Sequence, residues 1–196
     1  MPVTKWIDVE QNSDEWFDLR LGRATSSNFD TIMANDGKAF GEPAKKYAQK
    51  VALERLTGKR DLTGNFQSKS MERGNILEPV VRAMYEKETF YSVTNGGIHI
   101  SDKLGDSADG LVGKRGCVEI KVVEPTAFWD RLKHGGIKKA YKYQIQGHLY
   151  LGERDWCDFV CMCPEFPRDK SLYIYRQRRD EDMQAKLKTR LMLFEN

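Results

Sequence analysis

The chain has 196 residues, of which 40% are hydrophobic and 31% are charged, and its formal net charge is +3 at pH 7. This length suits one domain with a sizeable core, and the composition excludes a disordered chain. No apolar run approaches the ~20 residues of a membrane span, and the N-terminus lacks the apolar core of a signal peptide. We therefore expect a single cytoplasmic domain over residues 1–196 that does not bind membranes.

The first third of the chain is predicted to be mostly helical. Spacing and boundary signals predict helices over 13–21, 28–33 and 43–55, with a polar connection over 60–69. Gly22 is expected to end the first of these helices, and the hydroxyl residues at 25–27 offer caps for the second. Pro43 suits the first turn of the third helix, because proline lacks the N–H that this turn leaves unpaired.

A longer helix is predicted over 70–88. Its apolar residues recur at spacings of three to five and are expected to form one broad buried face: Met71, Ile76, Leu77, Val80, Val81 and Met84. Glu78 lies beside this face. A carboxylate there needs a partner, which a metal ion can provide, and the alternative is an ordinary exposed helix acid.

Residues 105–121 are expected to form the centre of the fold. Two short apolar runs flank a glycine-containing loop at 113–115, which is typical of a β-hairpin. If the loop occupies these residues, Val112 faces Gly116 across the antiparallel pair. The same register fixes every other cross-strand pair of the hairpin.

This register gathers three charged side chains at one end of the hairpin. It places Asp109 opposite Glu119, with their Cβ atoms ~5 Å apart. Strand alternation puts Lys121 on the same face as Glu119. Two carboxylates this close repel each other unless a cation joins them, and a divalent ion with oxygen ligands is a natural occupant. The alternative is a surface hairpin whose charges are simply solvated.

The C-terminal third is predicted to alternate helices and strands, with helices over 126–133, 138–151 and 180–195 and strands over 155–163 and 171–177. Alternation in the first of these strands puts Cys157, Cys161 and Cys163 on one face with Phe159. The sequence contains no C-x2-C pair, so we expect four reduced thiols and neither a zinc site nor an iron–sulfur cluster.

These residues carry a family resemblance. Asp109 followed by Glu119-Ile120-Lys121 resembles the core of the PD-(D/E)XK nucleases. Ser107-Ala-Asp109-Gly-Leu is similar to its phage lambda exonuclease branch, the viral alkaline exonuclease-like recombinases. Further matches follow in the family's order: Trp16-x3-Arg20-Leu-Gly with Thr25 and Ser27, Gly74-x3-Glu78, and a glutamine-containing helix that holds Gln144 and Gln146.

The resemblance implies an α/β fold with a central mixed β-sheet flanked by helices, as in restriction endonucleases. It assigns Mg²⁺, which Mn²⁺ can replace, to Glu78, Asp109, Glu119 and the Ile120 carbonyl. Lys121 would activate the attacking water, and Gln144, narrowly favoured over Gln146, would position it. The 5′-phosphate of the DNA end would be held by Arg20, Ser27 and Ser107.

The implied activity is 5′→3′ digestion of linear double-stranded DNA to 5′ mononucleotides, leaving a 3′ overhang for recombination by strand annealing. Relatives form ring-shaped homotrimers, often beside a single-strand annealing protein. The chain departs from the family at Val122-Val123-Glu124-Pro125, where a Cys-Pro pair is usual. Alternatives are an endonuclease or single-strand nuclease of this fold, a non-catalytic DNA-binding module, and a structural α/β domain. His148 is expected to be structural rather than a general base.

Overall fold

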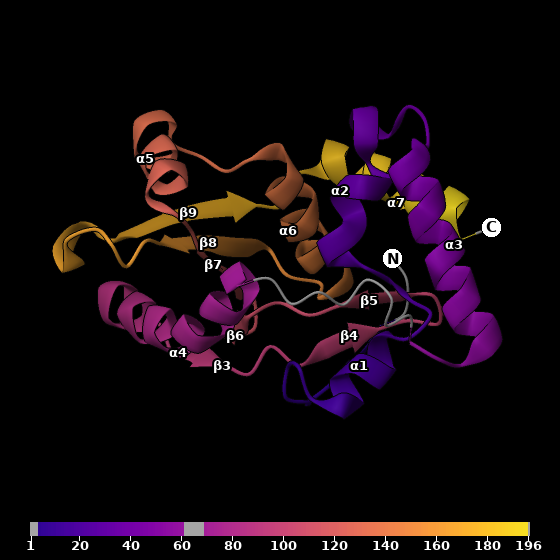
Figure 1. Ribbon diagram of the computed structural model, residues 1–196, viewed down its shortest axis with the longest axis horizontal. Helices are drawn as coiled ribbons and strands as arrows, with labels where there is room; N and C mark the ends of the chain where they lie inside the picture. The colour runs from indigo at the N-terminus through magenta and orange to yellow at the C-terminus, as the bar shows by residue number, and fades with distance from the viewer. Residues whose placement is uncertain (1–3, 61–68, 196) are drawn as a thin grey trace.

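The computed structural model describes residues 4–60 and 69–195, so most of the polar connection predicted over 60–69 lies outside the described residues. The helices and strands follow the order shown in Figure 1. Their bounds are β1 (Lys5–Ile7), α1 (Asp14–Arg20), β2 (Ala24–Thr25), η1 (Ser26–Asn28), α2 (Phe29–Ile32), η2 (Ala34–Gly37), α3 (Glu42–Thr57), α4 (Lys69–Thr89), β3 (Val93–Thr94), β4 (Ile98–Ile100), β5 (Leu104–Asp106), β6 (Gly110–Val112), β7 (Gly116–Val122), α5 (Pro125–His134), α6 (Lys139–Leu151), β8 (Trp156–Met162), η3 (Arg168–Lys170), β9 (Leu172–Arg178) and α7 (Glu181–Phe194).

The described strands form two mixed sheets, which confirms the predicted fold class and adds a second sheet to the one expected. The larger sheet has the order β3-β6-β7-β8-β9, and the smaller has the order β1-β4-β5-β2. In the larger sheet β7 pairs with β8 in parallel, and the connection between them contains α5 and α6. A parallel pair requires such a crossover, because a tight turn cannot join the two strands.

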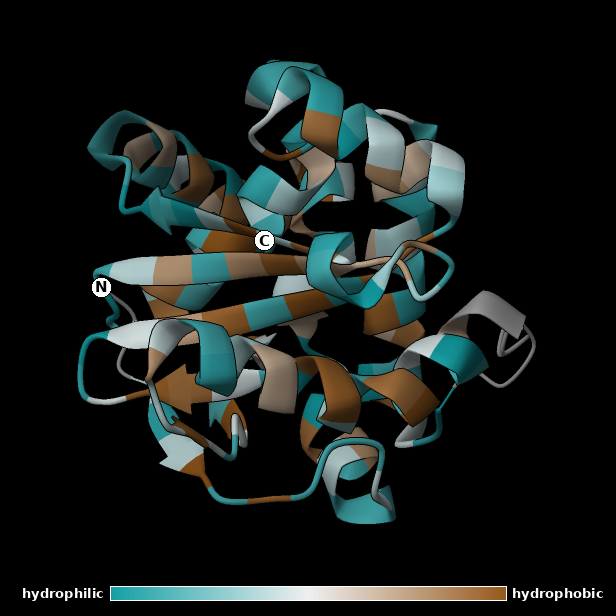
Figure 2. Ribbon diagram, turned by 90° about the vertical axis from the view of Figure 1, so that its left-hand side faces the viewer, coloured by the Kyte–Doolittle hydropathy of each residue, from teal (hydrophilic) through white to brown (hydrophobic). Residues whose placement is uncertain are grey.

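Both faces of the larger sheet are covered. Helices α5 and α6 pack on the face that carries Cys117, Cys157 and Phe159, as predicted for the cysteine-rich strand. Helix α4 packs on the opposite face through Val81 and Tyr85. Figure 1 shows β7, β8 and β9 between these helices, and Figure 2 shows hydrophobic residues recurring along the strands while the outer helix faces are largely hydrophilic. This double coverage explains why β7 and β8 are buried along most of their length.

The hairpin at the centre of the fold has the predicted register. Val112 pairs with Gly116, and Gly110 pairs with Val118, across antiparallel β6 and β7. Gly113 adopts a φ of 53°, a left-handed conformation that glycine tolerates without steric cost. The tight loop therefore follows directly from the sequence.

Two predictions, one about the buried face of α4 and one about helix capping, are wrong. The broad buried face of α4 is narrower than expected: Met71, Ile76 and Val80 are 59%, 68% and 50% exposed. A helix lying on a sheet buries only the stripe that touches it, and here that stripe passes through Val81 and Tyr85, four residues apart. The hydroxyl residues at 25–27 are also not caps, because neither η1 nor α2 has a side-chain cap hydrogen bond.

Candidate active site

The end of the β6–β7 hairpin places Asp109 against the middle of β7. Strand β6 begins at Gly110, which pairs with Val118. Asp109 therefore lies one residue before the paired part of the strand and does not form the expected pair with Glu119. Its N–H donates to the Val118 carbonyl at 3.1 Å, and its Oδ2 accepts the Ile120 N–H at 2.6 Å. These two bonds fix the Asp109 carboxylate beside the Ile120 peptide.

Glu119 belongs to β7, and its buried side chain contacts three other side chains. Its Oε1 accepts hydrogen bonds from Lys121 and, at 2.6 Å, from Gln144 Nε2. Its Oε2 lies 2.9 Å from His148 Nε2. Lys121 reaches Glu119 because alternate residues of a strand share a face, whereas Gln144 and His148 come from α6, which covers that face. Both oxygens of Glu119 therefore have strong donors.

Glu78 approaches the same place from α4 through Arg82, which lies one helical turn further along. Arg82 Nη2 is 3.4 Å from Glu78 Oε1 and donates to the Asp109 carbonyl at 2.5 Å. The guanidinium thus joins the helix acid to the hairpin acid, and part of the negative charge of Glu78 is balanced inside the protein.

The charges of the site shift its pKa values in opposite directions. Loss of solvent, followed by repulsion from Glu119 and Glu78, raises the pKa of Asp109 to about 8. Burial also acts against ionisation of Glu119, but Lys121 and His148 outweigh it and lower the pKa of Glu119 to about 2. Burial raises the pKa of Glu78, with Arg82 opposing. A site that makes ionisation of two carboxylates costly favours a further cation.

The three acid-bearing elements meet at a cavity of about 450 Å³. Its lining includes Glu78, Asp109, Ile120, Lys121 and Tyr141. In the part of the chain that the structure describes, no group of three or more His, Cys, Asp or Glu side chains is arranged to hold a metal ion. The reason is local: Glu119 faces Lys121 and His148, and Glu78 faces Arg82. The donors still fit a hard divalent cation, since all are oxygens and the carboxyl of Asp109 is destabilised when it is ionised.

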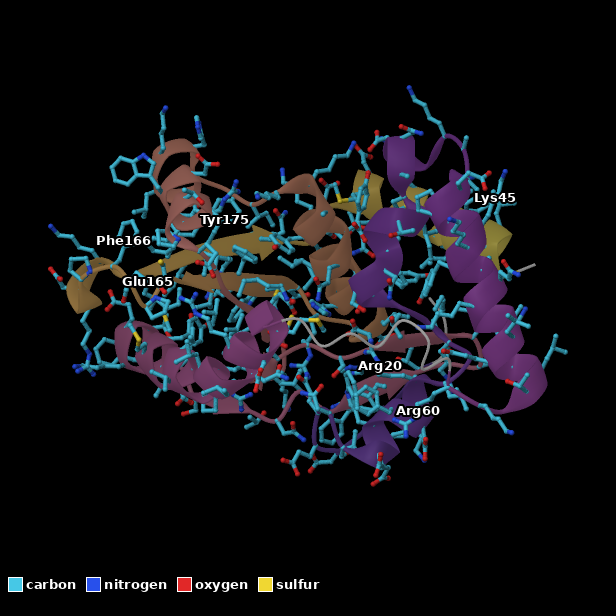
Figure 3. The ribbon with its side chains drawn as sticks, in the orientation of Figure 1. Arg20, Lys45, Arg60, Glu165, Phe166 and Tyr175 are labelled. Carbon is cyan, nitrogen blue, oxygen red and sulfur yellow. The ribbon has the colours of Figure 1, made fainter. Side chains whose placement is uncertain are left out.

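A second cavity, of about 180 Å³, is lined by Arg20, which is one of the three residues expected to hold phosphate; Ser27 and Ser107 do not line it. Arg20 and Arg60 both line it, and Figure 3 shows them beside α1. Arg20 stacks on Trp16 with its guanidinium carbon 4.1 Å from the ring centroid, and its Nη2 lies 3.4 Å from Thr25 Oγ1 and 3.3 Å from Ser27 Oγ. In the described residues its contacts are thus hydroxyls and a ring, which leaves the guanidinium charge available to an anion.

The structure does not place Ser107 in this cavity. Its hydroxyl accepts hydrogen bonds from Gln11 Nε2 and Trp16 Nε1, both at 2.9 Å, and donates to the Gly97 carbonyl at 2.7 Å. These bonds use the one donor and both acceptor positions of a serine hydroxyl. Ser107 therefore supports Trp16, on which Arg20 stacks, and a direct phosphate bond would require it to release one of these partners.

The two glutamines of α6 contact different parts of the protein. Gln144 reaches Glu119, whereas Gln146 is buried and bonds the Arg178 carbonyl and Gln184. The structure thus brings Gln144 to the acids and directs Gln146 to α7. The two differ by two positions, which is more than half a helical turn and turns them to different sides.

Sequence reasoning missed two supporting side chains. Asp106 and Arg82 touch the site through His148 and Asp109, respectively. Asp106 lies between Gly105 and Ser107 at the end of β5, and nothing in a single sequence shows that its side chain is buried. The spacing of Arg82 from Glu78, four residues along a helix, was the one readable sign of an ion pair.

Comparisons with known proteins agree with this geometry. The model of the YqaJ-like viral recombinase domain matches residues 15–155. An alkaline exonuclease from Laribacter hongkongensis is 32% identical, with a TM-score of 0.84 over 93% of this chain and 90% of that one. The same enzyme in complex with dAMP gives 32% identity and a TM-score of 0.83, over the same shares of the two chains.

A phage-related exonuclease from Haemophilus somnus 129PT shares the fold, with 16% identity and a TM-score of 0.67 over 88% of this chain and 92% of that one. No curated protein matches the chain significantly. Within the described residues, no helix is both long and apolar enough to cross a membrane. The family match covers most of the chain, including every residue of the acidic site, and the chain belongs to the YqaJ-like viral recombinase family of DNA-hydrolysing enzymes.

Proposed function

We propose that the protein is a Mg²⁺-dependent exonuclease that digests linear double-stranded DNA from its 5′ ends. The observation that carries this proposal is the meeting of Glu78, Asp109, Ile120 and Lys121 at one cavity. Oxygen donors from two carboxylates and a carbonyl, with an ammonium beside them, suit phosphodiester hydrolysis better than a merely solvated surface. The alkaline exonuclease from Laribacter hongkongensis, which is 32% identical to this chain, supports the same class of reaction.

The metal would be held by Glu78, Asp109, Glu119 and the Ile120 carbonyl, with Mn²⁺ as a substitute for Mg²⁺. When bound, a divalent ion supplies charge neutralisation at the phosphate and activation of water. Lys121 would hold the attacking water or stabilise charge developing on the phosphate oxygens. Its pKa is raised by Glu119 and Asp109 despite burial, which favours the second role. Gln144 would orient Glu119 and, with it, the water.

The polarity of cleavage would come from the second cavity. Arg20 and Ser27 would hold the 5′-phosphate, since a guanidinium forms paired hydrogen bonds with phosphate oxygens. A 5′ end held beside the acidic site releases 5′ mononucleotides and leaves a 3′ overhang, suited to recombination by strand annealing. The Laribacter hongkongensis enzyme has been solved with dAMP, a nucleoside monophosphate, which supports this product class.

Two further proposals, a homotrimeric assembly and a single-strand annealing partner, rest on the resemblance alone. A third, a single domain over residues 1–196, rests on the length of the chain. Cytoplasmic action agrees with a DNA substrate and with four free, buried cysteines. The competing function with the most support is an endonuclease of the same fold, which would keep the acidic site and would not depend on a 5′-phosphate.

The deciding experiment uses linear duplex DNA labelled at either end, with and without a 5′-phosphate, in Mg²⁺ or EDTA. We expect Mg²⁺-dependent release of mononucleotides from phosphorylated 5′ ends and no cleavage of closed circular duplex. Cutting of the circle would support the endonuclease instead. DNA that is bound but stays intact under every condition would leave only a binding module.

A further inference from the structure

A buried chain of three ionisable side chains runs behind the acidic site. His148 Nδ1 lies 2.6 Å from Asp106 Oδ1, and His148 Nε2 lies 2.9 Å from Glu119 Oε2. All three side chains are only 1% exposed. Each ring nitrogen of His148 lies within hydrogen-bond distance of a carboxylate oxygen. The imidazole is therefore held at both ends, and it fixes the rotation of Glu119.

The chain also joins the two sheets. Glu119 lies on β7 of the larger sheet and Asp106 lies on β5 of the smaller one, while His148 belongs to α6. Gly147, next to His148, lets α6 approach η1 and α2 closely because it has no side chain. A Cβ there would lie 2.8 Å from the Ser26 Cβ and 2.8 Å from a Phe29 ring carbon.

The two carboxylate oxygens of Glu119 contact different residues. Oε2 faces His148, on the buried side, whereas Oε1 accepts Gln144 and Lys121, the latter a residue that lines the cavity. Any ligand that displaces Lys121 from Oε1 leaves the Oε2 bond in place.

We propose that His148, held by Asp106, is a positioning residue that aims Glu119 at the metal site. The proposal rests on the proposed nuclease function. It assigns to this pair a role that the motif residues do not have: neither side chain lines the cavity, and both act only through Glu119. Partners that orient a metal-binding side chain commonly contribute ten- to a hundredfold to metal affinity.

The test distinguishes the contact of His148 Nε2 with Glu119 from the contact of His148 Nδ1 with Asp106. In His148→Gln the amide nitrogen can replace Nε2 and donate to Glu119, whereas in His148→Asn it can replace only Nδ1 and reach Asp106. We expect His148→Asn to bind Mn²⁺ about 10- to 100-fold more weakly in calorimetric titration. On linear duplex it should lower kcat with little change in KM. His148→Gln should retain more of both, and His134→Asn on α5 is the matched exposed control.

Each outcome decides something. Folded His148→Asn that binds Mn²⁺ as tightly as wild type, with only a lower Tm, overturns the proposal, because a purely structural role predicts that result. Equal losses in the Asn and Gln variants would also overturn it, since the contact to Glu119 would not matter. If His148→Asn does not fold, Asp106→Asn in the same titration decides. Wild-type protein that neither binds Mn²⁺ nor cleaves DNA would refute the proposed function itself.

Discussion

Asp109 is expected to cost the protein stability, and replacing it by asparagine should show this. The pKa of Asp109 is raised from 3.8 to about 8, first by loss of solvent and then by Glu119 and Glu78. Between these pH values the folded protein keeps a proton that the unfolded chain has released. The free energy of unfolding of wild type therefore falls as pH rises from about 4 to about 8. Asparagine has nearly the same shape and no charge, so its contribution does not change with pH.

The size of the effect follows from the shift. One pKa unit corresponds to about 1.4 kcal/mol, and most of the interval between pH 5.5 and 8.5 lies within the shifted range. The side chain of Asp109 remains partly accessible to water, and this reduces the effect. We expect the stability of Asp109→Asn relative to wild type to improve by about 1–3 kcal/mol from pH 5.5 to pH 8.5. In a chain of this size that is roughly 3–10 °C in Tm.

The assay is urea denaturation of both proteins at the two pH values with EDTA, followed by cleavage of linear duplex with Mg²⁺. Asp109→Asn should gain relative stability with pH and lose cleavage completely. Asp130→Asn, on the exposed side of α5, should show neither change. If the free energy of unfolding of Asp109→Asn relative to wild type stayed constant or decreased as pH rises, it would refute the claim that the ionised Asp109 carboxylate destabilises the folded protein.

Three other variants test separate parts of the structure. Lys121→Met should reduce cleavage by about 10²–10⁴-fold, measured as single-turnover rate, whereas Lys186→Met, which removes a surface lysine that pairs with Asp36, should not. Arg20→Lys should lower the rate ratio of 5′-phosphorylated to 5′-hydroxyl ends at least several-fold, because lysine cannot form paired bonds with phosphate; an unchanged ratio would exclude Arg20 from phosphate binding. Tyr85→Phe removes a 2.7 Å hydrogen bond to buried Asp158 and should cost about 1.5–3 kcal/mol in urea denaturation, with cleavage retained.

The sequence predicted best where a local rule settles the structure. The hairpin register came from one loop and from strand alternation, and it correctly put Lys121 beside Glu119. It failed at Asp109, because a residue beyond the last ladder pair is no longer bound by the pairing rule. The same limit applies to α4: periodicity identified the helix, but the width of its buried face depends on how much of it the sheet covers.

The supporting residues of the site were harder to find, for a different reason. His148 is 42 residues from Asp106 and 29 from Glu119, so no local period relates them. They meet only because the crossover between β7 and β8 returns α6 over the strand that carries Glu119, and because Gly147 lets that helix approach η1.

The partners of the acidic residues explain how the folded protein accommodates several acids near one cavity. Glu78 pairs with Arg82, Glu119 pairs with Lys121 and His148, and Asp109 accepts the Ile120 N–H. Each acid thus has a cationic or N–H partner from its own or a neighbouring element. Buried charges that lack such partners would be strongly destabilising. The pairing is uneven, because Asp109 receives only a peptide N–H and the carbonyl contact of Arg82 does not neutralise its carboxylate. Asp109 is therefore the acid for which an added cation would relieve the largest remaining cost.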